Sequence, residues 1–241
     1  MAKLPMNYDN YVFDLYGTLV DIRTDEDHDF VWEKLALFYG YYKALYTPDE
    51  LKDAYGRLVA GKEKEMKYSH EACPEIEITE VFEDLFREKG VEPGKELAVH
   101  AGQFFRVLST EYVRIYDGTE QMLKQLRDEG KNVYLLSNAQ RIFTEYEMHI
   151  LDIFKYFNGV LISSDYETKK PDQKFFDILF EKYPMDKSKT LFIGNDSTTD
   201  IAGASKAGLD TYYICSNISP KGDSAPNATY SENEFEKWET A

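Results

Sequence analysis

The sequence predicts an α/β fold, with a Rossmann-like parallel sheet as its core and an all-helical domain inserted into it. Short apolar runs rich in strand-forming residues recur along the chain, and most are followed by a helical pattern. This alternation is typical of a parallel sheet that helices cover on both faces. After the first run it stops for about 90 residues, where only helix signals remain. A chain of 241 residues can hold one large domain with such an insert.

The first predicted strand covers Tyr11–Asp14 and ends in a carboxylate just before a glycine turn. Val12 and Phe13 are typical of the buried end of a strand, and Gly17 allows the chain to turn sharply. A residue at the end of such a strand lies at the carboxyl edge of the sheet, where open α/β folds bind their ligands. Asp14 is therefore the candidate nucleophile.

The insert is predicted between Ile22 and Tyr112, where helical patterns are separated by breaks at proline and glycine. A block of this kind, placed between the first strand and the rest of the sheet, indicates a separate helical domain. We expect a helical cap over residues 22–112 and a core formed by residues 1–21 and 113–241. The aromatic run Phe38–Tyr46 is expected to pack inside the cap rather than to bind substrate.

Four further strands are predicted after the insert, and each reads as a nearly continuous apolar run. They cover Asn132–Leu136, Gly159–Ile162, Thr190–Ile193 and Thr211–Ile214. Such runs are typical of strands that are buried on both faces. The segment Ser219–Tyr230 is rich in Pro, Gly, Ser and Asn, so we expect a loop there, followed by a short acidic helix at the end of the chain.

Three helices of the core are predicted from residues that favour helix ends. One follows Asp117–Thr119, carries an apolar stripe and stops at Gly130, which is a favourable residue after a helix. Another is expected to have Pro171 in its first turn, where proline is well tolerated. The third is predicted from Ser197 to Gly208.

The composition excludes several kinds of partner. A net charge of −16 opposes binding to nucleic acids, which need a basic surface, although local donors can still bind a small anion. Cys73 and Cys215 are far apart and lack metal-type spacing, so neither a disulfide framework nor a zinc site is expected. The four histidines, His28, His70, His100 and His149, also lack partner spacing and are expected to be surface or structural residues.

The chain shows no targeting or membrane signal. Its first residues lack an apolar signal core, and no apolar run approaches the roughly 20 residues needed to cross a bilayer. We therefore expect a cytoplasmic protein without nucleic-acid or membrane partners. It would act on a small anionic molecule as a monomer or homodimer.

Polar side chains gather just after the predicted strands. The carboxyl ends of parallel strands share one edge of the sheet, so these groups are expected to meet there despite their separation in the sequence. The groups are Asp14 with Tyr16 and Thr18, Ser137 with Asn138, Lys169 with Lys170, and Asn195 with Asp196 and Asp200.

These residue types allow displacement at an anionic centre. Asp14 and Asp196 offer hard oxygen ligands suited to Mg²⁺. Ser137 could hold an anionic oxygen at the start of the following helix, and Lys170 would neutralise charge on nucleophile and substrate. Asp200, four residues after Asp196, could hold a metal-bound water or orient the lysine.

The motifs resemble those of the haloacid dehalogenase-like (HAD) hydrolase superfamily. That family shows D-x-D-G-T, a Ser or Thr at a strand end, a Lys, and G-D-x-x-x-D, and this chain shows DLYGT, LLSNA, KKP and GNDSTTD in the same order. The resemblance spans nearly the whole chain, and the position of the insert suits the helical cap of the family.

This resemblance implies a role for each group. Asp14 would be the covalent nucleophile, Ser137 and Lys170 would bind the substrate anion, and Mg²⁺ would be bound by Asp14, Asp196 and the backbone carbonyl of Tyr16. Lys170 suits the family better than Lys169 because the lysine commonly stands directly before the proline. Further polar groups at the substrate are Thr18, Asn138 and Asn195.

Tyr16 departs from the phosphatase pattern. In phosphatases of the family an acid at this position protonates the leaving alcohol and then activates water, and tyrosine, with a pKa of about 10, is a poor substitute. The first motif instead resembles that of the 2-haloacid dehalogenases of the superfamily, which need no metal. The fourth motif, with Asp196, resembles that of the phosphatases. Tyr16 either walls the site with its ring or contacts the substrate.

Three functions remain open, and the first is favoured. The chain would be a Mg²⁺-dependent phosphatase of small organophosphates, acting through an aspartyl-phosphate on Asp14. The second possibility is a dehalogenase-like carbon–halogen hydrolase that uses Asp14 without metal. The third is a slow or inactive phosphoryl-binding protein, in which Tyr16 leaves a phosphoenzyme that barely turns over.

Overall fold

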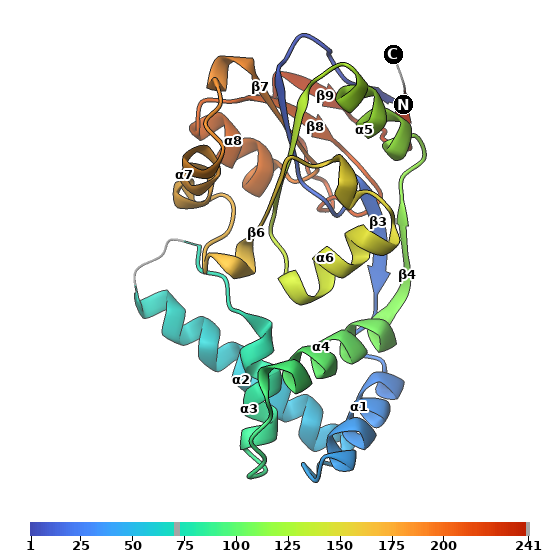
Figure 1. The fold of residues 1–241 in the computed structure, drawn as a ribbon, viewed down its shortest axis with the longest axis vertical. Coiled ribbons are helices and arrows are strands. Elements are labelled where there is room, and N and C mark those ends of the chain that lie inside the picture. The colour runs from blue at the N-terminus through green and yellow to red at the C-terminus, as the bar shows by residue number, and fades with distance from the viewer. Residues whose placement is uncertain (70–72, 240–241) are drawn as a thin grey trace.

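The computed structural model describes residues 1–69 and 73–239. Within them, the core is a six-stranded, all-parallel sheet with the strand order β6-β5-β2-β7-β8-β9 (Figure 1). Its strands are β2 (Asn10–Phe13), β5 (Asn132–Ser137), β6 (Gly159–Ile162), β7 (Thr190–Gly194), β8 (Asp210–Ile214) and β9 (Tyr230–Glu232). The predicted α/β fold class is confirmed, and all five predicted strands belong to this sheet.

The register of the sheet brings the ends of its central strands level. Phe13 of β2 pairs with Leu135 of β5 on one side and with Ile193 of β7 on the other. The residues that follow these three strands therefore emerge at the same edge. Asp14 follows β2 directly, between the ends of β5 and β7.

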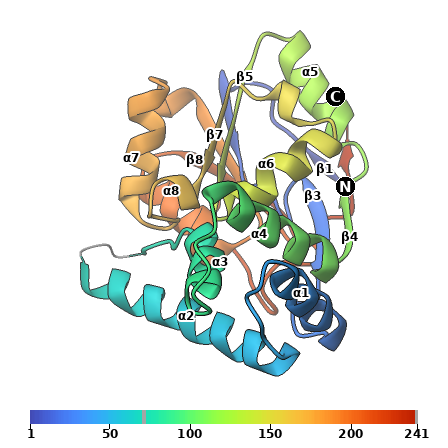
Figure 2. The same cartoon turned by 60° about the horizontal axis from the view of Figure 1, so that its bottom comes forward.

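Helices cover both faces of the sheet, as Figures 1 and 2 show. They are α5 (Thr119–Asp128), α6 (Arg141–Ile150), α7 (Gln173–Lys182) and α8 (Ala202–Lys206). Phe13 packs with apolar residues of α5 and α6, whereas its neighbour Val12 packs with those of α7 and α8. Successive strand residues point to opposite faces, so each face of β2 has its own apolar layer. Single-turn 3₁₀ helices lie at Phe154–Tyr156, Ser163–Asp165 and Lys187–Lys189.

Four helices between β2 and β5 form the insert, which has an apolar core of its own. They are α1 (Asp29–Tyr41), α2 (Pro48–Ser69), α3 (Ile78–Arg87) and α4 (Lys95–Ser109). The aromatic run contributes to this core, since Tyr39 is fully buried and stacks on Phe86 with ring centroids 4.1 Å apart. We call α1–α4 the four-helix insert.

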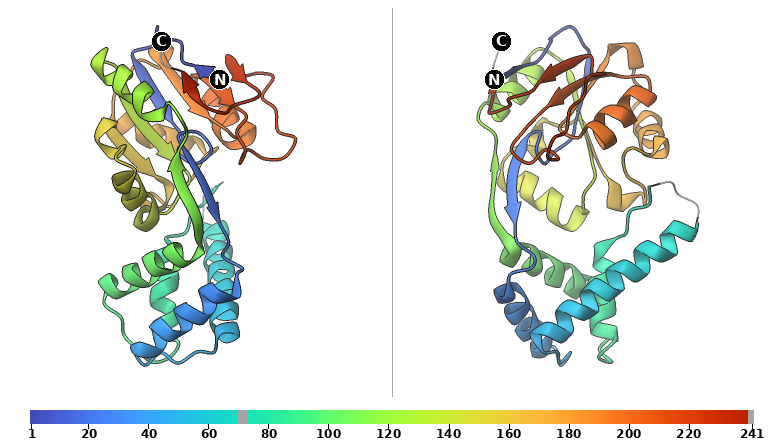
Figure 3. Two further views of the ribbon diagram at one scale, coloured as in Figure 1. Left: turned by 90° about the vertical axis from the view of Figure 1, so that its right-hand side faces the viewer. Right: turned by 180° about the vertical axis from the view of Figure 1, so that it is seen from behind.

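An antiparallel strand pair that sequence reasoning missed connects the insert to the core. The strands β3 (Val20–Thr24) and β4 (Thr110–Ile115) run side by side toward the insert (Figure 3). The predicted domain limits, Ile22 and Tyr112, fall inside this pair. Figure 2 shows α4 of the insert beside α6 of the core, and the two helices are in contact.

The predicted acidic helix at the end of the chain is wrong. The segment forms β9 and then β10 (Trp238–Glu239), which pairs with β1 (Ala2–Lys3). Trp238 is 2% exposed, and its indole N–H donates to the carbonyl of Thr18 at 3.1 Å. Burial of such aromatic side chains outweighs the modest helix preference of the acidic residues between them.

Two helices also differ from the predictions in their first turns. Pro171 lies before α7 rather than in its first turn, because the carboxylate of Asp172 caps the helix by accepting from the amide of Lys174. The predicted helix from Ser197 begins as a π-helix over Ser197–Ile201 and continues as α8. Among the described residues, the helices are all too short or too polar to span a bilayer.

Candidate active site

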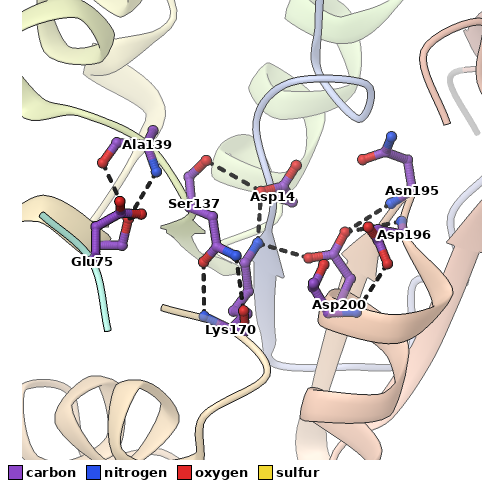
Figure 4. Close-up of polar contacts among 11 residues, drawn as sticks. Asp14, Glu75, Ser137, Ala139, Lys170, Asn195, Asp196 and Asp200 are labelled. Atoms are coloured by element: carbon purple, nitrogen blue, oxygen red, sulfur yellow. Dashed lines mark hydrogen bonds and ion pairs between the residues drawn. The ribbon is translucent and has the colours of Figure 1, made fainter. Parts of the chain in front are cut away.

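Asp14 lies at the centre of the polar groups at the carboxyl edge of the sheet (Figure 4). Asp14 is 7% exposed, and its Oδ1 accepts from the Lys170 ammonium at 2.6 Å and from the Ser137 hydroxyl at 3.2 Å. Within residues 1–69 and 73–239, Oδ2 accepts no hydrogen bond. The carboxylate is thus fixed by one oxygen, and the other can react or bind a ligand.

Lys170 is a buried cation between two carboxylates. It is 2% exposed, and its Nζ lies 2.6 Å from Asp14 Oδ1 and 2.7 Å from Asp200 Oδ1. Burial lowers the pKa of the lysine, but the two carboxylates outweigh it and raise the pKa overall, so the ammonium stays charged. Asn138 holds the lysine backbone through two hydrogen bonds, donating to the carbonyl at 3.0 Å and accepting from the amide at 2.8 Å.

Asp200 pairs with Lys170 through Oδ1, a contact that is compatible with the predicted role of orienting the lysine. Its other oxygen, Oδ2, accepts from the backbone amides of Asn195 at 3.0 Å and Asp196 at 3.1 Å. Burial is the main cause that raises the pKa of Asp200, to about 7, against the opposing effect of Lys170. The Asp200 carboxylate packs closely against Gly194, because a Cβ added at that glycine would lie 2.4 Å from Oδ2.

Asp196 caps the helix that follows β7. Its Oδ1 accepts from the amide and the hydroxyl of Thr198, both at 2.7 Å, and from the amide of Thr199 at 2.9 Å. Burial raises the pKa of this carboxyl, but the hydrogen bonds from the two threonines outweigh it and lower the pKa overall. Asp196 is therefore anionic, and its capping geometry fixes one of its two oxygens.

Asn195 and Thr18 line the turn that follows Asp14. The Asn195 carboxamide packs against Gly17 so closely that a Cβ there would lie 2.2 Å from Nδ2. Gly17 also has a φ of +84°, which favours glycine. Thr18 is fully buried, and its Oγ1 has no hydrogen-bond partner among the described residues. Both side chains remain candidates for contact with a substrate.

The Tyr16 side chain extends toward α6, where its hydroxyl contacts two residues. Its hydroxyl donates to Glu147 Oε2 at 2.5 Å and lies 3.1 Å from Thr144 Oγ1. Arg106 of the insert donates to the same glutamate, with Nε 2.7 Å from Oε1. Burial, followed by the charge of Glu147, raises the pKa of Tyr16, so the phenol stays neutral. Its hydroxyl is thus bound to α6, and a wall formed by its ring stays a prediction.

Sequence reasoning missed Glu147 and Arg106. A signal was available, because Glu147 is a charged residue three positions after Thr144 and next to Met148 on one helix. The structure buries all three residues. A buried carboxylate requires a partner from elsewhere in the fold. No local sequence pattern identifies Arg106 as that partner.

Glu75, which was also missed, docks the insert onto the core beside the site. Its Oε2 accepts from the Ser163 hydroxyl at 2.9 Å, and its Oε1 lies 3.6 Å from the Lys169 ammonium. Backbone hydrogen bonds join Glu75 to Glu167 and Lys169 to Cys73. Lys169 thus contacts the insert, whereas Lys170 contacts Asp14.

The donors near Asp14 fit a hard cation. Mg²⁺ prefers one or two carboxylates together with other oxygens, and Asp14 Oδ2, the Tyr16 carbonyl and the Asp196 carboxylate are donors of this kind. No group of three or more His, Cys, Asp or Glu residues with metal spacing occurs within the described ranges. The predicted ligand set, with two carboxylates and one carbonyl, does not require such a group.

Curated proteins similar in sequence include several phosphatases. The chain is 28% identical over 141 residues to the HAD-hydrolase YfnB of Bacillus subtilis, covering 58% of each chain. It is 28% identical to the pyrimidine 5'-nucleotidase PynA of Streptococcus pneumoniae, covering 55% of each. The chain is 25% identical to the phosphoglycolate phosphatase of Pseudomonas fluorescens, covering 82% of this chain and 66% of that protein. The matches thus span a little over half the length of YfnB and PynA.

Solved structures share the fold. The structure of Bacillus subtilis YfnB bound to magnesium superposes with a TM-score of 0.55 and 22% identity, over 95% of this chain and 96% of that one. The 2-haloacid dehalogenase of Pseudomonas syringae superposes with a TM-score of 0.60 and 19% identity, over 95% and 94% of the two chains. A family model of haloacid dehalogenase-like hydrolases matches residues 8–208. The chain therefore belongs to the haloacid dehalogenase-like hydrolases.

Proposed function

We propose that this hydrolase is a phosphatase of small organophosphates with Asp14 as its nucleophile. The observation that carries the proposal is the arrangement around Asp14, where Lys170 and Ser137 fix Oδ1 while Oδ2 accepts no hydrogen bond from any residue that the structure describes. A carboxylate oriented in this way beside a buried cation suits attack on an anionic centre. Relatives named as phosphatases support the choice of phosphate esters.

The reaction would proceed in two displacements. Asp14 attacks the phosphorus and the bond to the leaving oxygen breaks, which gives an aspartyl-phosphate and an alkoxide that takes a proton from solvent. Water then attacks the same phosphorus and loses a proton to solvent, which releases phosphate and restores the carboxylate. Lys170 offsets negative charge on the nucleophile and the phosphoryl oxygens, and the Ser137 hydroxyl donates to one of those oxygens.

Mg²⁺ is the proposed cofactor, and Asp14, Asp196 and the Tyr16 carbonyl would hold it. When bound, it would neutralise charge on the phosphoryl oxygens. We propose the four-helix insert as the cap of the family, which residues 22–112 were expected to form. The docking of Glu75 beside the Lys170 segment supports this role, because it brings the insert to the edge where the substrate would bind.

A carbon–halogen hydrolase is the second candidate, and the direction of Tyr16 favours it. The neutral phenol of Tyr16 is bound to Glu147, so it offers no general acid for a leaving alcohol. A departing halide needs no proton. The third candidate, a slow phosphoryl-binding protein, has the same chemical basis, because a missing base would leave the aspartyl-phosphate long-lived.

Hydrolysis of an aryl phosphate, with and without Mg²⁺, tests the proposal when 2-chloropropionate is assayed in parallel. Mg²⁺-dependent phosphate release that is lost in Asp14→Asn supports the phosphatase. Chloride release without metal overturns it in favour of the second candidate. A burst of one product per enzyme followed by very slow turnover would favour the third.

A further inference from the structure

We propose that Glu147 is a positioning residue that ties the catalytic loop to the four-helix insert, through Tyr16 on one side and Arg106 on the other. The catalytic loop is defined here as Asp14–Val20. This role rests on the proposed function, which assigns Asp14 as the nucleophile. Glu147 itself contacts neither Asp14 nor Lys170 in the hydrogen-bond network.

One carboxylate connects three elements of the fold. Glu147 lies on α6 of the core, and its Oε2 accepts from the hydroxyl of Tyr16, which belongs to the catalytic loop. Its Oε1 accepts from Nε of Arg106 on α4, and Nη2 of the same arginine lies 3.4 Å from Oε2. The loop and the insert therefore both bind the same carboxylate.

The contact is buried and charged, so its loss has a large effect. Glu147 is 6% exposed, and the Arg106 side chain is 16% exposed. The guanidinium also lies over the rings of Tyr16, at 5.7 Å, and Phe143, at 5.3 Å. Removing the carboxylate would leave a buried arginine without its charge partner and a buried phenol without its acceptor, and both are costly.

The catalytic loop transmits this anchoring to Asp14. It is a tight turn, in which the Gly17 amide donates to the Val20 carbonyl at 2.8 Å and the Leu19 amide donates to the Leu15 carbonyl at 2.8 Å. Tyr16 follows Asp14 by two residues, so movement of the Tyr16 side chain displaces the nucleophile. A misplacement of about 1 Å can reduce the rate of the chemical step about 100-fold.

The test combines hydrogen exchange with kinetics in Glu147→Met and Glu147→Gln. We expect Glu147→Met to raise amide exchange of residues 15–20 at least about 10-fold. It should also lower kcat for an aryl phosphate about 100-fold while KM changes less than about threefold. Glu147→Gln, which keeps the shape and an acceptor for Tyr16, should show a smaller change of the same kind. If residues 15–20 exchange as in the wild type, the proposal is wrong.

Glu145→Gln is the matched control. Glu145 lies on the same helix and pairs with Arg141 at 2.8 Å, away from Tyr16. Its substitution removes one carboxylate from α6 and should leave exchange of residues 15–20 and kcat unchanged. Equal exchange of residues 15–20 in Glu147→Met and Glu145→Gln would contradict the proposal, because loss of any carboxylate from α6 would then loosen the catalytic loop.

Arg106 provides the independent variants. Arg106→Met should loosen residues 15–20 as Glu147→Met does, and Arg106→Lys, which restores a cation, should recover most of the protection. Lack of any difference between the methionine and lysine variants would overturn the link to the insert. Exchange is measured without substrate, so these results stand even if the protein hydrolyses no phosphate ester.

Discussion

Two buried charge clusters flank the catalytic loop, and they differ in what they leave unsatisfied. Around Lys170, two carboxylates share one cation, and Oδ2 of Asp14 has no hydrogen bond within the described residues. Around Glu147, one carboxylate is shared by a cation and a phenol, so its charge is balanced. A cluster with an uncommitted oxygen can react, whereas a satisfied one holds the fold in place.

Asp14→Asn should give the largest effect, because it removes the proposed nucleophile from the Lys170 cluster while preserving the shape of the side chain. We expect aryl phosphate hydrolysis to fall at least about 1,000-fold. Steady-state assays with the wild type as reference measure this. If Asp14→Asn retained about a tenth of the activity, the Lys170 cluster would not be the reacting one.

Lys170→Met tests the charge balance of the same cluster. It leaves two buried carboxylates without their cation, so we expect the free energy of unfolding to fall by about 3–5 kcal/mol. Lys169→Met is the matched control, since that side chain is 37% exposed, and it should change stability by less than about 1 kcal/mol. Urea denaturation of both variants measures the difference, and similar losses would contradict a buried, shared cation.

Tyr16→Phe tests the Glu147 cluster, because it removes the hydrogen bonds that join the hydroxyl to Glu147 and Thr144. We expect the free energy of unfolding to fall by about 2 kcal/mol. The matched control is Tyr156→Phe, whose hydroxyl donates to Glu120 at 3.1 Å on the surface. That change should cost less than about 0.5 kcal/mol. Equal costs in urea denaturation would show that the bond to Glu147 has no special role.

Glu75→Gln should give the smallest effect on stability, and the size of this effect depends on pH. Burial is the main cause that raises the pKa of Glu75 above its usual value of 4.5. Above pH 4.5 the folded state therefore binds more protons than the unfolded state, and this contribution to stability is lost as pH rises through the folded pKa. Glutamine does not titrate, so the variant should gain up to about 1 kcal/mol relative to the wild type between pH 4.5 and 7.

Urea denaturation at several pH values checks this last expectation. The control is Glu145→Gln, which lies on the surface of α6 and should show no comparable trend. A stability difference between Glu75→Gln and the wild type that decreases as pH rises would show that ionised Glu75 is favoured in the fold.

The Lys170 cluster was predictable from the sequence because each member lies at a fixed place in a recurring pattern. Asp14, Ser137 and Asp196 directly follow or end apolar strands, and parallel strands bring such positions to one edge. The core strands were predictable for the same reason. Their apolar runs are continuous and bounded by turn residues, so their ends could be placed within one residue.

The Glu147 cluster was not predictable because its partners meet only through the packing of α4 on α6. Arg106 and Glu147 are 41 residues apart, and no local pattern relates them. The final strands were missed for a similar reason, since Trp238 is ordered by contacts with Thr18 and the core. Tertiary contacts of this kind override local propensity.

Acid quenching during turnover of an aryl phosphate tests the central claim most directly. Mass spectrometry of the peptide that contains Asp14 should then show one added phosphoryl group in the wild type and none in Asp14→Asn. Sustained phosphate release by the wild type without any modification of that peptide would contradict the account, because Asp14 would not be the group that attacks.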